Sequence, residues 1–281
     1  MFLVNLINVL RTLVLLFSSV LILLIAYYIS ASPLLLSEFS HALIDFLTIL
    51  SSFLMLKILQ NSYMEKGKYT YGLHRLELFI SLINITAIVS LSIFSAYISI
   101  ISFFNGVLDT HPIILLIASS IVAILTYFSN IKDSDEDLGK KSIYTHILSD
   151  LLGYLIGILV GVLILVFNIY ELDPIGALVV VGITMGFSVP LLKETLLIFM
   201  EGSPVNIDEV ERDLKEVSPN IHHIHIWSIC SHIRVATLHV KVEPTTTISE
   251  ADKIRDSIYN LLKEKYNISH ITVQFETSGE D

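Results

Sequence analysis

Two pairs of residues with the spacing His-x-x-x-Asp lie inside apolar stretches of the chain. The first pair is His41 and Asp45, and the second is His146 and Asp150. Residues four apart on an α-helix share one face, so each pair presents an imidazole and a carboxylate to the same side. Two such helices facing each other supply four nitrogen and oxygen ligands, which Zn²⁺ accepts as a tetrahedron. Ca²⁺ and Mg²⁺ ask for about six or more oxygens, so the pairs predict a zinc-type site.

A histidine or aspartate inside a membrane can also be interfacial, or hydrogen-bonded within a helix bundle. An ionisable residue within a bilayer costs at least ~2.5 kcal/mol, so two uncompensated pairs would carry a heavy penalty. The same spacing in two separate apolar stretches therefore favours ligands of one ion. At ~1.5 Å per residue, Asp45 lies ~18 Å from Pro33, and Asp150 lies ~12 Å from Ser142 on the opposite side. Both depths approach the middle of a bilayer core that is ~30 Å thick.

The elements that must position these pairs are membrane helices. The chain is 53% apolar and 16% charged, with a mean hydropathy of +0.73. In soluble domains about 25% of the residues are charged. The apolar residues form runs long enough to cross a bilayer. We predict six spans, the first of them retained rather than cleaved, at residues 9–30, 34–58, 76–104, 111–131, 142–168 and 174–199.

Charge in the connections orients the chain. The predicted loops 1–2, 3–4 and 5–6 contain no Lys or Arg, whereas the other side carries Arg11, Lys57, Lys66, Lys68, Arg75, Lys132, Lys140, Lys141 and Lys193. The positive-inside rule then places both termini in the cytoplasm of a multi-pass protein, which we assign to the cell membrane. The net charge of −10 argues against a nucleic-acid partner.

The pattern changes after residue 202. Helical periodicity at residues 206–217 and 249–266, with Asn206 and a serine as caps, alternates with strand-like segments at 222–228, 233–242 and 271–276. The predicted fold class is a polytopic α-helical membrane protein with six transmembrane helices, followed by a small α+β, ferredoxin-like (αββαβ) cytoplasmic domain. The predicted domains are residues 1–202 and 203–281.

Three further features bear on possible sites. Glu38 shares a helix face with the first pair and is either an ion-handling residue at the outer mouth or an exposed residue at the headgroups. Gly153, Gly157 and Gly161 form a small-residue stripe that favours close packing of the fifth span, with the second span as a possible neighbour. The chain has one cysteine, so we expect no disulfide or thiolate cluster, and nitrogen and oxygen ligands at any metal site.

The sequence resembles the cation diffusion facilitator family of zinc-exporting antiporters. Besides the two His-x-x-x-Asp pairs, the matching segments are residues 71–77 (YGLHRLE), 173–175 (DPI), 201–204 (EGSP) and 222–227 (HHIHIW). The match covers nearly the whole chain in the order of the family. It implies a homodimer in which each protomer exchanges a metal ion for protons by alternating access. It also implies that His41, Asp45, His146 and Asp150 form the transport site.

The same resemblance implies a second metal site in the cytoplasmic domain. Mapped by motif, its ligands are His222, His239 and Glu276, with Asp252 as a possible bridging ligand. The alternative is a set of strand-surface histidines that titrate near their ordinary pKa. Strict strand alternation puts His223 and His225 on one face with Trp227 and puts His222 on the other.

The chain departs from the family at the loop between spans two and three. Lys66, Tyr69 and Leu73 occupy the positions of a metal site found in some bacterial relatives, so we expect that site to be absent. His74 is then expected to be an interfacial residue. The acidic run at residues 133–137 is expected to be solvated. By analogy with relatives, Arg75 is expected to pair with Glu201 and lock the dimer hinge.

The resulting hypothesis is Zn²⁺/H⁺ antiport out of the cytoplasm, with no enzymatic activity. Co²⁺, Cd²⁺, Fe²⁺ and Mn²⁺ remain alternative substrates, although imidazole ligands favour zinc over manganese or iron. A rival class is a metal-responsive sensor for which the bundle is only an anchor. An intramembrane metalloenzyme is disfavoured because the chain has no His-Glu-x-x-His motif.

Overall fold

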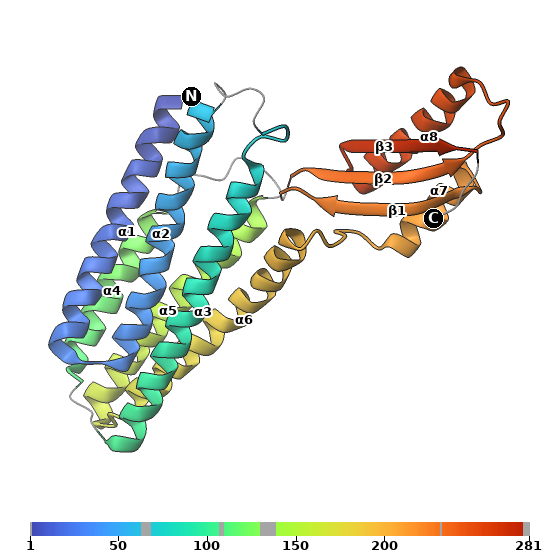
Figure 1. Cartoon of the computed structure of the whole chain (residues 1–281). Coiled ribbons are helices and arrows are strands. Elements are labelled where there is room, and N and C mark those ends of the chain that lie inside the picture. Colours follow the sequence, from blue (N-terminus) through green and yellow to red (C-terminus); the bar gives the residue numbers. More distant parts are fainter. Residues whose placement is uncertain (1, 63–68, 107–109, 130–138, 231, 278–281) are drawn as a thin grey trace. The chain divides into compact units, whose positions relative to one another are not determined.

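Six long helices precede a small α+β domain in the computed structural model (Figure 1), which describes residues 2–62, 69–106, 110–129, 139–230 and 232–277. The helices are α1 (Phe2–Ser30), α2 (Pro33–Ser62), α3 (His74–Asn105), α4 (Pro112–Ser129), α5 (Gly139–Phe167) and α6 (Leu172–Phe199). Within the described residues, each contains a stretch long and apolar enough to cross a membrane, which confirms the six predicted spans. Proline begins α2 and α4, where its missing N–H costs no hydrogen bond.

The chain divides into two compact units. The first comprises Met1–Met64 and Ile80–Leu192, and the second comprises Glu65–Phe79 and Lys193–Asp281. The first turns of α3 and the last turns of α6 therefore belong to the second unit, together with the α+β domain.

Helices α1, α2, α4 and α5 approach one another most closely in the first unit. Their shared core includes Leu23, Leu34, Leu115 and Ile164, which are fully buried. A Cβ at Gly161 would lie 3.1 Å from the Leu116 side chain and 3.2 Å from its backbone nitrogen. The glycine stripe of α5 thus allows close packing, as predicted, but the backbone it meets at Gly161 is that of α4.

A buried aspartate ties together three connections at one end of this unit. Asp173, at the start of α6, accepts hydrogen bonds from the Ser32 hydroxyl at 2.8 Å and the Leu34 amide at 3.0 Å. The Thr110 hydroxyl donates to its other oxygen. The Leu34 contact satisfies a free N–H in the first turn of α2. The start of α2, the connection before α4 and the start of α6 are therefore held at fixed positions.

The α+β domain consists of α7 (Ile207–Val217), β1 (Ile221–Ser228), β2 (Arg234–Lys241), α8 (Ile248–Tyr266) and β3 (His270–Glu276). The predicted α-β-β-α-β order is confirmed. Asn206 caps α7, as predicted, by accepting from the Asp208 amide at 3.0 Å. The cap of α8 is Thr247, in a capping box with Glu250, rather than the predicted serine.

The three strands form one mixed sheet with β2 in the centre, antiparallel to β1 and parallel to β3. Both helices cover one face of the sheet. Val210 of α7 and Ile258 and Leu262 of α8 pack there with inward residues such as Leu238. The other face carries the histidines of β1 and β2.

Candidate metal centre

Three of the four predicted membrane ligands meet inside the first unit. His41 and Asp45 project from the same face of α2, and Asp150 reaches them from α5. The His41 Nε2 lies 2.8 Å from the Asp150 Oδ1 and 3.6 Å from the Asp45 Oδ2. One ligand atom from each residue lies within 4.8 Å of the other two, close enough to share one ion.

The carboxylates of this cluster are almost completely removed from solvent. Asp45 is 7% exposed and Asp150 is 6% exposed. Two ionised carboxylates in such surroundings require a cation, since an uncompensated buried charge costs several kcal/mol. Either a proton on the imidazole or a divalent metal at the same place supplies that cation. A proton and a metal ion would therefore compete for the same groups at this place.

His146 belongs to α5, one helical turn before Asp150. Its side chain lies outside the part of the helix whose side chains the structure describes. The assignment of His146 as fourth ligand rests on the unbroken helix and on the spacing of four residues.

Polar side chains from three helices lie beside His41. Ser37 and Ser40 of α2, Ser92 and Ser95 of α3 and Thr184 of α6 line a small cavity beside the imidazole. A second cavity, which Tyr154 also lines, contacts both His41 and Asp150. Each hydroxyl group offers a hydrogen-bond donor and acceptor beside the imidazole. Sequence reasoning missed these residues because isolated serines and threonines in membrane helices carry no distinctive pattern.

Glu38 is buried inside the bundle, at 1% exposure. The Ser119 hydroxyl of α4 lies 2.9 Å from each of its carboxylate oxygens. A Cβ on Gly157 of α5 would overlap both side chains, so this glycine makes room for the contact. Of the two alternatives drawn from the sequence, the exposed headgroup residue is therefore wrong.

A second cluster lies on the open face of the sheet. The His222 Nε2 is 2.7 Å from one Glu276 oxygen, and the His239 Nδ1 is 3.4 Å from the other. The Asn220 carbonyl lies 3.3 Å from the His222 Nδ1, and a hydrogen bond there leaves Nε2 available as a ligand. Asp252 is not in this group: it lies on α8 and pairs with Arg255 at 2.7 Å. A bridging role for Asp252 stays a prediction.

A β-bulge places His222 in this cluster. His222 pairs with His239, and from there three steps along β1 correspond to two along β2. The bulge contains His223, whose φ of +50° is uncommon for a residue other than glycine. Because paired residues share a face, the bulge brings His222, His225 and Trp227 to one side. The prediction from strict alternation, which separated His222 from the other two, is wrong for this reason.

The predicted contact between Arg75 and Glu201 is present. The guanidinium Nη2 lies 2.5 Å from the Glu201 Oε1, and both side chains are more than half exposed. An exposed pair of this kind stabilises a protein by about 1 kcal/mol or less, and its role as a dimer hinge stays a prediction. Tyr69 and Leu73 offer no metal ligand in the described part of the loop. Lys66 and the acidic run at residues 133–137 lie outside the described residues.

Two family models together match nearly the whole chain. The cation efflux transmembrane domain matches residues 9–200, and the cytoplasmic domain of cation efflux proteins matches residues 203–278. The chain belongs to the cation efflux family. This cation efflux protein is accordingly a multi-pass membrane protein of a transporter family, as its sequence motifs indicated.

Relatives of this cation efflux protein extend over most of its length. A cadmium, cobalt and zinc/H⁺-K⁺ antiporter of Bacillus subtilis is 29% identical over 90% of this chain and 83% of its own. The zinc transporter ZitB of Yersinia pestis is 28% identical over 89% of this chain and 80% of its own. The Escherichia coli ZitB has the same identity and coverage.

Proposed function

We propose that this cation efflux protein exports a divalent metal ion, zinc foremost, from the cytoplasm in exchange for protons. The transported ion binds His41, Asp45, His146 and Asp150. One observation carries the proposal: the His41 Nε2 lies between the buried carboxylates of Asp45 and Asp150. The protein works as a transporter and not as an enzyme.

Proton coupling follows from the ligands themselves. Zinc binds neutral imidazoles and ionised carboxylates, so loading from a neutral cytoplasm displaces protons. When the site opens to a more acidic outer face, protons bind the same groups and expel the ion. No separate proton relay is required for the exchange.

Zinc is the preferred substrate because two imidazoles and two carboxylates suit its tetrahedral coordination. The relatives named above include zinc transporters and an antiporter whose name adds cadmium and cobalt. Cd²⁺ and Co²⁺ are therefore the first alternative substrates, ahead of Fe²⁺ and Mn²⁺.

The sheet cluster forms a cytoplasmic zinc site in the same proposal. His222, His239 and Glu276 supply three ligands, which leaves one position for a bridging group. Residues 203–281 act as the dimerisation domain of a homodimer in the cell membrane, with both termini in the cytoplasm. Metal at this site then reports the cytoplasmic zinc level to the transporter.

The rival function is a metal-responsive sensor in which the bundle is only an anchor. It would retain the sheet cluster but would have no need for carboxylates buried at mid-membrane depth. A sensor would bind zinc and change shape without moving the ion across a bilayer.

The test uses the full-length protein in proteoliposomes that contain a zinc-sensitive dye. Under an inward-acid pH gradient, we expect zinc to accumulate in the lumen and protons to leave it. Collapsing the gradient with an ionophore should stop the accumulation. Zinc entry that ignores the gradient would contradict antiport, and zinc binding without any entry would favour the sensor.

A further inference from the structure

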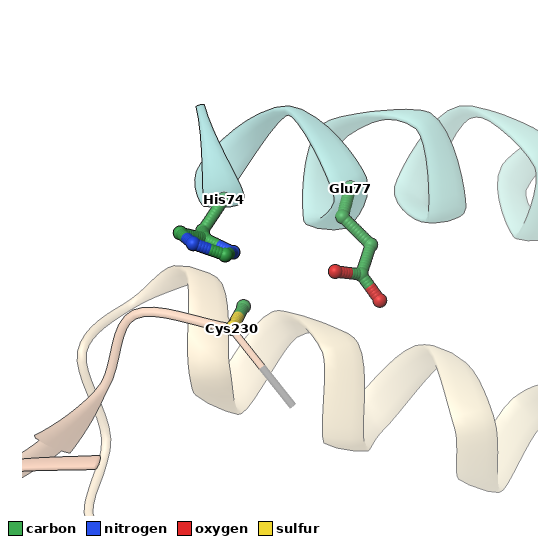
Figure 2. Close-up of side chains that lie close together, drawn as sticks. All are labelled: His74, Glu77 and Cys230. Carbon is green, nitrogen blue, oxygen red and sulfur yellow. The ribbon is translucent and has the colours of Figure 1, made fainter. Parts of the chain in front are cut away.

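A third group of potential metal ligands lies within the second unit, apart from both clusters described above. It consists of His74 and Glu77 from the first turn of α3 and Cys230 from the segment that follows β1. One ligand atom from each lies within 4.8 Å of the other two. Figure 2 shows both side chains extending from α3 on the side where Cys230 lies, with His74 next to the cysteine.

The start of α3 sets the positions of His74 and Glu77. Residues three apart in a helix are neighbours on one face, so the two side chains project together. The turn before the helix closes with a hydrogen bond from the Gly72 amide to the Tyr69 carbonyl, at 3.0 Å, and Gly72 adopts a φ of +70°. A Cβ on Gly72 would lie 3.5 Å from the His74 ring, which therefore rests against this turn.

The segment after β1 fixes the cysteine. Cys230 is fully buried, and the preceding Ile229 amide donates to the Ile233 carbonyl at 2.9 Å. The His232 amide points at the Cys230 sulfur from 3.4 Å. An N–H that points at a thiolate orients the sulfur in the way that supporting hydrogen bonds orient metal ligands.

The ordinary alternative is a histidine beside a glutamate, with an inert buried cysteine next to them. A buried cysteine more often serves as a small apolar side chain than as a ligand. The combination of three different ligand types at one point favours a metal. A thiolate, an imidazole and a carboxylate suit Zn²⁺, Co²⁺ and Cd²⁺, and three protein ligands leave a fourth position open.

We propose that His74, Glu77 and Cys230 bind a thiophilic divalent cation. Binding displaces the thiol proton to solvent and leaves a metal–thiolate bond. The ion then fastens the first turn of α3 to the segment after β1. The proposal departs from two expectations drawn from the sequence, that His74 is an interfacial residue and that any metal site uses nitrogen and oxygen ligands alone.

The sequence offers a specific test, because Cys230 is the only cysteine of the chain. A thiolate-to-cobalt charge-transfer band in the full-length protein can therefore come from this residue alone. Titration of the reduced, zinc-free protein with Co²⁺ should produce such a band, whose final amplitude corresponds to a single thiolate–cobalt bond per chain. Zinc added afterwards should displace cobalt and remove the band.

Variants separate this site from the other two clusters. Cys230→Ala should abolish the band, and His74→Ala and Glu77→Gln should each weaken cobalt binding by ~10-fold or more. The double variant Asp45→Asn with Glu276→Gln serves as the control and should retain the band. Fluorescence of the single tryptophan, Trp227, confirms that each variant is folded.

Two results would overturn the proposal. The first is a wild-type protein that binds cobalt without any charge-transfer band. The second is a band that persists at the same cobalt concentration in both His74→Ala and Glu77→Gln, since it would report a lone thiol. Neither result depends on transport, so the antiport proposal can stand or fall separately.

Discussion

The membrane cluster and the sheet cluster use the same types of ligand but differ in how far those ligands are exposed to solvent. At the membrane cluster, the Asp45 and Asp150 side chains are 9% and 5% exposed. At the sheet cluster, the His222 side chain is 38% exposed, whereas the His239 and Glu276 side chains are each 16% exposed. An ion at the first cluster would be almost completely enclosed, whereas an ion at the second would stay in contact with solvent on the side of His222.

The difference in burial suits the two clusters to different functions. A buried set of charged ligands pays a desolvation cost that only a bound cation offsets, so its occupancy is coupled to the state of the bundle. A set of ligands with one exposed histidine carries less of this cost, so its occupancy would depend more directly on the surrounding metal concentration. This difference fits the proposal that the first cluster transports the metal and the second senses it.

The largest expected effect separates the two clusters by metal affinity. In a Cys230→Ala background, Asp45→Asn should weaken zinc binding at the membrane cluster by ~100-fold and leave the sheet cluster unchanged. Glu276→Gln should do the reverse. Calorimetric titration of the full-length protein in detergent measures both sites. An Asp45→Asn isotherm identical to that of the parent would refute the assignment of the membrane cluster.

The next effect tests the close packing of α5 against Glu38 and Ser119. Gly157→Ala should destabilise the bundle by ~1–3 kcal/mol, because the new methyl group overlaps Glu38 and Ser119. Gly182→Ala is the matched control, since no atom lies within 4 Å of a Cβ there. Thermal unfolding in detergent compares the two variants. Equal melting temperatures would show that α5 is not packed as described.

A smaller effect isolates the hydrogen bonds of Glu38. Ser119→Ala removes the hydroxyl next to this buried carboxylate and should cost ~1–2 kcal/mol in the same thermal assay. The neighbouring Ser120 donates to the Leu116 carbonyl of its own helix at 2.6 Å, so Ser120→Ala serves as the control. A larger loss from Ser120→Ala than from Ser119→Ala would contradict a structural role for the Ser119 contact.

The smallest effect concerns the solvent-facing domain. Hydrogen bonds from Lys265 and from the Tyr266 hydroxyl hold the pKa of Asp213 below its ordinary value. A lowered folded-state pKa stabilises the domain above the unfolded pKa of ~3.9, and the contribution disappears as the pH falls through the lower folded value. Asp213→Asn should therefore be less stable than wild type at neutral pH, with the gap closing in acid.

Urea unfolding, followed by Trp227 fluorescence at neutral and at acidic pH, measures the difference in stability between Asp213→Asn and wild type. Glu216→Gln, an exposed carboxylate on the same helix, should show no comparable dependence on pH. A gap for Asp213→Asn that widens in acid would reverse the predicted sign.

The membrane cluster could be predicted from the sequence because its residues follow helical spacing. His41 and Asp45 share a face because they are four residues apart, and apolar flanks mark the helix that carries them. The sheet cluster was located by motif. The side of β1 on which His222 lies was predicted wrongly, because a bulge at His223 changes the alternation of side chains. Such a bulge depends on the pairing of β1 with β2, which no local pattern in β1 reveals.

Contacts between segments distant in sequence were the least predictable. The burial of Glu38 depends on Ser119 and Gly157, which come from two other helices. The meeting of Cys230 with His74 joins residues more than a hundred positions apart. Neither cysteine nor serine carries a periodic signal that would show these partners in advance.

Transport by single-site variants tests the central claim most directly. Zinc accumulation in proteoliposomes under an inward-acid gradient should fall to the background of empty vesicles for Asp150→Asn. Glu276→Gln should retain transport at saturating zinc, because the sheet cluster only senses the metal. Undiminished transport by Asp150→Asn, with background transport by Glu276→Gln, would contradict the account.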